Sequence, residues 1–75
     1  MANTTFSGPV ISNNGFTSTA FLFANLPTAS ENTGRIIFVS NALKASETAG
    51  NGTGNLVFSD GSNWIRVDTG ATAAA

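Results

Sequence analysis

The sequence predicts an all-β fold, namely a small antiparallel β-sandwich or barrel-like module that carries an N-terminal extended arm and is completed by oligomerisation. Short runs of β-branched and aromatic residues, separated by Gly, Asn, Asp and Pro, are typical of strands joined by turns. The chain is 41% hydrophobic, with six Phe and one Trp, which is too apolar for a disordered chain. Its 75 residues form one marginal core. Because Cys and His are both absent, association with other protein surfaces is the remaining source of stability.

Residues 1–15 are predicted to form the extended arm. The stretch 4–12 is β-prone, but Gly8-Pro9 interrupts it, and proline cannot donate a hydrogen bond to a strand ladder. This stretch is therefore an edge strand or an extended arm. Asn13-Asn14-Gly15 follows it and is a turn signal.

Residues 16–68 are predicted to form the β module. Its first strand covers residues 16–26, where Phe and Thr favour a pleated surface. A helix over residues 20–25 is the alternative. Leu26-Pro27 ends the element in either case.

The middle of the module contains the clearest strand. Before it, residues 28–31 match a helix capping box with Gly34 as the stop, which predicts one helical turn or an ordinary loop. Residues 35–40 then form a run of β-branched residues that predicts a strand buried on both faces. The long loop 41–54 follows, and a helical turn is expected near residues 43–47.

A C-terminal hairpin is predicted over residues 55–67, because Asp60-Gly61 between two apolar runs is a strong hairpin signal. Strand alternation places four apolar residues on one side, which is expected to be the core side: Leu56, Phe58, Ile65 and Val67. The other side is mixed and is formed by Val57, Ser59, Trp64 and Arg66. Residues 69–75 are an Ala-rich tail.

The low charge of the chain excludes several classes of partner. The chain has three basic and four acidic residues, for a net charge of -1, and the basic residues form no cluster in the sequence. We therefore expect no binding to nucleic acid and no electrostatic binding to membranes. A charged fraction of 9% is far below the roughly 25% of ordinary soluble domains, which favours a protein that packs against neighbours. The sequence shows neither a signal peptide nor a long apolar run, so synthesis in a cytoplasm is expected.

The chain is not expected to be an enzyme. Serine is plentiful, but no His or Cys is present to act as base or nucleophile. Ser59-Asp60-Gly61 does not match the nucleophile elbow Gly-x-Ser-x-Gly. Asp60 is explained by its turn, so a pair of catalytic carboxylates is not indicated either. We expect no metal site and no cofactor.

The large exposed side chains are the candidates for intermolecular contacts. Trp64 with Arg66 has the composition of an interface anchor, although plain core packing also explains Trp64. In the arm, Phe6, Val10 and Ile11 would reach a partner if the arm pairs with the sheet edge of a neighbour. The alternative is that the arm packs on its own subunit.

Several motifs follow one another in an order that resembles a known family. They are Leu26-Pro27, Gly34-Arg35-Ile36-Ile37-Phe38-Val39-Ser40, Gly52-Thr53-Gly54-Asn55-Leu56-Val57-Phe58 and Ser59-Asp60-Gly61-Ser62-Asn63-Trp64. In this order they resemble a small β module that is common in virion structural proteins of tailed bacteriophages, including decoration and tail-fibre proteins. Phe6-Ser7-Gly8-Pro9-Val10 with Asn14-Gly15-Phe16 is similar to the start of short phage structural proteins. The motifs span most of the chain, and Asn41 stands where this module more usually has Asp.

The resemblance implies a component of the virion. The chain has the module and a short arm without a fibre shaft, so it resembles a capsid decoration (cement) protein. Such a protein would bind the outer capsid shell after synthesis in the host cytoplasm. Its partners would be the major capsid protein and itself, as a homotrimer. The alternative is a tail-fibre or tail-tip subunit that recognises a host-surface receptor, with the Gly- and Asn-rich loop 51–55 as the contact.

Overall fold

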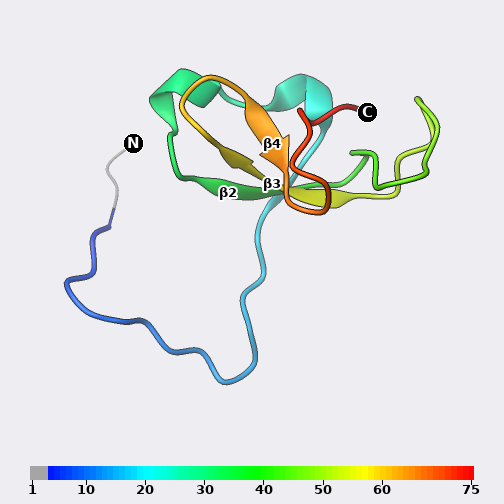
Figure 1. Cartoon of the computed structure of the whole chain (residues 1–75). Helices are drawn as coiled ribbons and strands as arrows, with labels where there is room; N and C mark the ends of the chain where they lie inside the picture. The colour runs from blue at the N-terminus through cyan, green and yellow to red at the C-terminus, as the bar shows by residue number, and fades with distance from the viewer. Residues whose placement is uncertain (1–3) are drawn as a thin grey trace.

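The structure is a computed structural model that describes residues 4–75, and its body is one open β-sheet of four strands (Figure 1). The elements in chain order are β1 (Ala20–Phe21), η1 (Phe23–Asn25), η2 (Ala29–Glu31), β2 (Ile36–Val39), β3 (Asn55–Ser59) and β4 (Trp64–Arg66). The two η elements are short 3-10 helices, and no α-helix occurs within residues 4–75. The all-β class is confirmed. The antiparallel sandwich or barrel is wrong for the single chain, since the sheet is open and mixed.

The sheet has the strand order β1-β2-β3-β4, and the mixed character comes from its first pair. β1 runs parallel to β2, with Ala20 opposite Phe38 and Phe21 opposite Val39, whereas the other two pairs are antiparallel. Parallel neighbours require a crossover of a dozen or more residues. Residues 22–35 provide this crossover and contain η1 and η2.

The strand predicted over residues 16–26 is much shorter in the structure. Only Ala20–Phe21 pairs with β2, and Ser40 N–H donates to the Phe21 carbonyl at 2.9 Å just beyond the paired residues. The chain then turns into η1, where Asn25 N–H donates to the Leu22 carbonyl at 2.9 Å. The strand is short because residues 4–19 lie against no neighbouring strand.

The single helical turn predicted at residues 28–31 is confirmed as η2, but its capping box is not formed. Thr28 occupies the N-cap position without a capping hydrogen bond from its side chain. Instead, the Asn32 side-chain amide donates to the Thr28 carbonyl at 2.8 Å. Gly34 follows with a positive φ of 84°, and its N–H donates to the Ser59 carbonyl at 2.8 Å. The chain thereby leaves η2 already joined to the end of β3.

The predicted C-terminal hairpin is confirmed as the pair β3–β4. Ser59 lies opposite Trp64, so the connecting loop is residues 60–63. The Asp60 carboxylate accepts hydrogen bonds from the backbone N–H groups of Ser62 and Asn63, at 2.9 and 2.8 Å. This is the local bonding that makes Asp a favoured turn residue.

The Ala-rich tail folds back along the outer edge of β4. Ala73 N–H donates to the Trp64 carbonyl at 2.8 Å, and Arg66 N–H donates to the Ala71 carbonyl at 2.9 Å. An isolated antiparallel bridge joins Thr72 to Ile65 between them. The tail thus covers an edge that would otherwise expose unpaired backbone groups.

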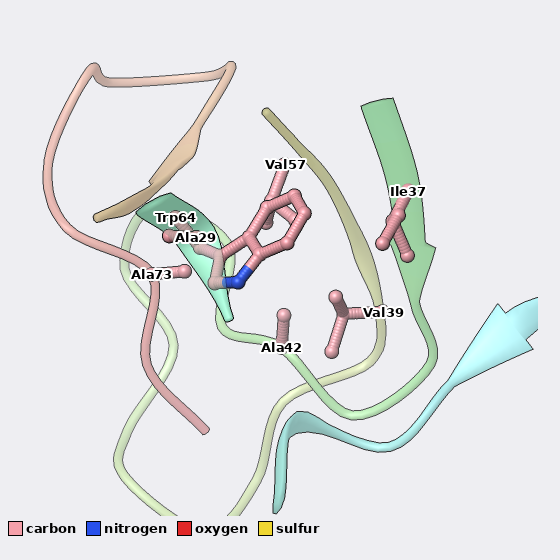
Figure 2. Packing of buried hydrophobic residues seen from close by; sticks show 7 residues of the cluster. All are labelled: Ala29, Ile37, Val39, Ala42, Val57, Trp64 and Ala73. Carbon is pink, nitrogen blue, oxygen red and sulfur yellow. The ribbon is translucent and has the colours of Figure 1, made fainter. Parts of the chain in front are cut away.

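The core lies on the opposite side of the sheet from the one predicted. Val57 is 0% exposed and Trp64 is 8% exposed, and they pack with Ile37, Val39 and three alanines from the crossover, the long loop and the tail (Figure 2). The expectation that Leu56 and Val67 mark the core face is therefore wrong. The physical reason is that the crossover, loop 41–54 and the tail all cover the Val57 side.

Two buried polar groups on the core side are satisfied by the crossover. The Trp64 indole Nε1–H donates to the Pro27 carbonyl at 2.8 Å. The Ser59 hydroxyl donates to the Ala29 carbonyl at 2.6 Å and accepts from Gly61 N–H at 3.2 Å. Because their hydrogen bonds are made, burying these polar groups carries little penalty. The mixed composition of this face is thus compatible with a core.

The long loop 41–54 contains no helical turn near residues 43–47, contrary to expectation. A tight turn stands there instead, closed by Glu47 N–H donating to the Lys44 carbonyl at 3.1 Å, with Ser46 at a φ of 72°. The loop returns over the core, where Gly54 N–H donates to the Ala42 carbonyl at 3.0 Å. Gly52 packs so closely that a Cβ atom would overlap the backbone of residues 41–42.

Replacing Gly52 by Ala is expected to lower the free energy of unfolding by about 1–3 kcal/mol, the usual range for forcing extra volume into a filled site. Urea unfolding followed by Trp64 fluorescence measures the change. Gly8→Ala is the matched control, because no heavy atom lies within 4 Å of the added carbon there. An unchanged urea midpoint for Gly52→Ala would contradict the close packing of this loop.

Candidate interaction surfaces

The first candidate surface is the arm, which we define as residues 4–19. It forms a wide loop outside the body (blue to cyan in Figure 1), residues 4–6 return beside residues 31–35, and every residue in it is exposed. Its side-chain hydrogen bonds stay within the arm, as in the 2.7 Å bond from the Ser12 hydroxyl to the Gly15 carbonyl. That bond closes the turn predicted at residues 13–15. The arm is therefore separated from the core packing of the body. Residues 1–3 of the predicted arm lie outside the described residues.

The arm presents large apolar side chains to solvent. Phe6, Val10 and Ile11, the predicted contact residues, are all strongly exposed, with Ile11 at 85%. Phe16 is 80% exposed and belongs to the same set, although the sequence pattern placed it in a strand. Residues 4–19 contain no charged side chain. The arm thus offers only apolar and neutral polar groups to a partner.

The structure separates the other two predicted contact residues from the arm. Trp64 fills the core and has its indole N–H bonded within the body, so plain core packing accounts for it. Arg66 binds the Asp68 carboxylate through Nε at 2.9 Å and Nη2 at 3.0 Å. This bidentate pair occupies its guanidinium within the body.

The second candidate surface is the side of the sheet that faces away from the core, which we call the open face. Cross-strand pairing sets Ile36 beside Phe58 and Phe58 beside Ile65. The six side chains of the open face are all apolar: Ile36, Phe38, Leu56, Phe58, Ile65 and Val67. Ile36 is 65% exposed and Val67 is 51% exposed, while the aromatic side chains are half-buried. The face therefore presents a continuous apolar surface.

Sequence reasoning found the residues of the open face but misjudged their environment. It assigned four of them to the core and predicted burial of residues 35–40 on both sides. Within the single chain, Ile37 and Val39 are buried, whereas Ile36 is exposed. Alternation identified which side chains lie together, but it contains no information about which face the rest of the chain covers.

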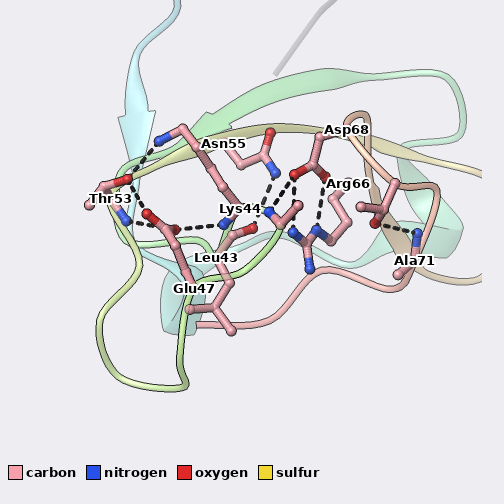
Figure 3. A network of polar contacts seen from close by, with 10 residues as sticks. Leu43, Lys44, Glu47, Thr53, Asn55, Arg66, Asp68 and Ala71 are labelled. Atoms are coloured by element: carbon pink, nitrogen blue, oxygen red, sulfur yellow. Dashed lines mark hydrogen bonds and ion pairs between the residues drawn. The ribbon is translucent and has the colours of Figure 1, made fainter.

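A polar network joins loop 41–54 to the end of β4 (Figure 3). The Glu47 carboxylate accepts from the Thr53 hydroxyl and from Lys44 N–H, both at 2.6 Å. The Thr53 hydroxyl and the Lys44 N–H therefore hold the pKa of Glu47 below its ordinary value. Thr53 also accepts from the Lys44 ammonium at 2.7 Å. These contacts order the loop and hold the Glu47 carboxylate in its charged form near neutral pH.

Asp68 ties the same loop to β4. Its carboxylate pairs with Arg66 and accepts from Ala45 N–H at 2.8 Å. The Arg66 hydrogen bonds, followed by that of Ala45, hold the pKa of Asp68 well below its usual range. Asn55, from the loop considered for receptor contacts, is buried and donates to the Leu43 carbonyl at 3.1 Å. The polar groups of this region are thus engaged in structure.

Other features of residues 4–75 offer little for chemistry. A small open hollow of about 240 Å³ lies beside Trp64 and is lined mainly by apolar residues such as Phe23, Leu26 and Pro27. No group of three or more carboxylates stands together as a metal site in this part of the chain. No helix formed by these residues is long and apolar enough to span a bilayer.

Comparison with models of protein families, with curated proteins and with solved structures gave no match to this chain.

Stability is expected to fall as the solution is acidified below about pH 4. Glu47, Asp60 and Asp68 have lowered pKa values in the folded state, so the unfolded chain binds more protons in this range. The stabilisation by these three carboxylates is complete above the ordinary pKa values, 4.5 for Glu and 3.8 for Asp. It is lost as the pH falls through their lower pKa values in the folded state. Urea midpoints at neutral pH and at about pH 3 test this. Asp68→Asn should flatten the dependence, and an unchanged slope in that variant would contradict it.

Proposed function

We propose that this chain is a structural component of a bacteriophage virion, a decoration (cement) protein that binds the outer capsid shell. The observation that carries the proposal is the extent of unpartnered apolar surface on so small a body. Phe6, Ile11 and Phe16 stand exposed on the arm, and Ile36, Leu56 and Val67 stand exposed on the open face. Exposed apolar surface of this extent marks a site of protein–protein contact.

The low charge of the chain supports the same function. Only 9% of its residues are charged, and the Arg66 guanidinium is already paired with Asp68. A chain of this composition gains solubility when its apolar surfaces are covered by other subunits. Each large apolar side chain that becomes fully buried contributes about 1.5–3 kcal/mol, so a few such contacts per copy suffice for stable binding.

A decoration layer acts by adding many such contacts across the joints between capsid subunits. Each copy would bind the major capsid protein and neighbouring copies of itself, in the expected homotrimer. Linked copies bind with an avidity that exceeds the affinity of one copy by about 10²–10⁴. The layer would then resist the pressure of the packaged genome, because rupture must break many contacts together.

The test is co-sedimentation of the purified protein with phage capsids that lack it. We expect saturable pelleting and a raised temperature of capsid rupture. The variant Phe6→Ser/Ile11→Ser should bind at least about a hundredfold more weakly, because two large apolar contacts, with the shell or with neighbouring copies in the layer, are lost. Thr5→Ser/Thr17→Ser changes neutral polar residues of the same arm and is the matched control. Binding to host cells with none to capsids would replace this function by receptor recognition at the tail.

A further inference from the structure

We propose that the open face of one copy is the binding site for the arm of a second copy, so that copies are joined by exchanged arms. This inference rests on the proposed function, because copies meet when they bind side by side on the capsid shell. It names a partner for the arm and for the open face, two surfaces that a single chain leaves uncovered.

The two surfaces match in chemistry. The arm supplies Phe6, Val10, Ile11 and Phe16, and the open face is apolar at all six of its positions. Neither surface contains a charged side chain. Docking one on the other therefore buries no unpaired charge, which is the most costly event at an interface. The contact is expected to persist at high salt, because no ion pair contributes to it.

The area of the surfaces favours the arm as the occupant over a second open face. The strands of the face have 2, 4, 5 and 3 residues, so the face covers only about 220 Å², given strand spacing and rise. Two such faces packed together bury about 450 Å², which is well below the 1,200 Å² or more of stable interfaces, taken as an approximate lower bound. Each arm adds two Phe side chains that bury about 150–250 Å² each. Reciprocal exchange of two arms onto two faces reaches about 1,000–1,400 Å², which overlaps the range of stable interfaces.

The route of the chain also favours a second copy. An extended arm of residues 4–19 spans up to about 50 Å, which exceeds the longest extent of the whole chain, 40 Å. In the structure the arm loops outside the body and residues 4–6 return beside residues 31–35 (Figure 1). Phe6 and Ile11 of the arm and Ile36 of the open face nevertheless remain more than half exposed. The arm is therefore long enough to cross the sheet of a neighbour while still joined to its own β1.

The edge of the sheet offers a place for the backbone of the incoming arm. β1 pairs only with Phe38 and Val39, so the first half of β2, Ile36 and Ile37, has no strand beside it on that edge. An extended segment can add to such an edge through main-chain hydrogen bonds. The arm contact joins two unlike surfaces, so it closes either as a reciprocal dimer or as a ring of three copies.

Two full-length variants separate the two halves of the contact. The arm variant is Phe6→Ser/Ile11→Ser/Phe16→Ser, and the face variant is Ile36→Lys/Val67→Lys. All five residues are more than half exposed, and Trp64 fluorescence reports that each variant is folded. Thr48→Lys/Ala49→Lys adds the same charge to exposed positions of loop 41–54 and is the matched control for the face variant.

The experiment measures the mass of the purified protein by sedimentation equilibrium, without capsids present. We expect an oligomer for the wild type and the control, and a monomer for each variant alone. An equimolar mixture of the two variants should form a one-to-one pair that is weaker than the wild-type oligomer, because one copy supplies an intact arm and the other an intact open face, so that one of the two contacts forms. Addition of salt should not dissociate the wild type.

Three results would overturn the inference. The first is a wild type that stays monomeric at every concentration, as it would if the arm covered its own face. The second is an arm variant that still associates, which would indicate packing of face against face. The third is a mixture in which no pairing is detected even at the highest concentration attainable, while the wild type associates. None of these results depends on capsid binding, so failure of the inference is distinguishable from failure of the proposed function.

Discussion

Two hydrogen bonds between the hairpin and the crossover decide how this chain is built. The Trp64 indole donates to the Pro27 carbonyl, and the Ser59 hydroxyl donates to the Ala29 carbonyl. Both donors are buried. A buried donor without a partner costs about 1–3 kcal/mol, which is a large part of a free energy of unfolding of about 5–15 kcal/mol. The crossover is therefore held over the Trp64 side of the sheet, and the core forms beneath it.

With the crossover on this side, too few residues remain to cover the open face of the sheet. Loop 41–54 contributes Ala42 to the core and the tail contributes Ala73, so both cover the same face as the crossover. Only the arm remains, and it forms a loop outside the body whose residues are all exposed. The result is a sheet whose mixed side is covered by its own chain and whose apolar side is left open. A small domain in this condition gains most of its further stability by association.

The distribution of polar groups agrees with a structural role. The carboxylates of Glu47, Asp60 and Asp68 all accept backbone N–H groups, and Asp68 also pairs with Arg66. These groups fix a loop, a turn and the end of β4, and their lowered pKa values follow from these bonds. The surfaces that remain available for partners are apolar. Polar groups thus hold the body together, whereas apolar groups form the arm and the open face.

The sequence by itself determined the all-β class, the hairpin around Asp60-Gly61 and the strand at residues 36–39, which was predicted over residues 35–40, because turn chemistry and side-chain alternation are local properties. It left open whether the arm with Phe6 and Ile11 packs on its own subunit. It also did not determine the length of the first strand, since strand pairing requires a neighbour that residues 16–19 lack. Side-chain alternation also grouped the hairpin side chains correctly, but the face that was predicted to be the core is the open one. Only the tertiary structure decided which face is the core, because long-range hydrogen bonds from Ser59 and Trp64 fix where the crossover lies.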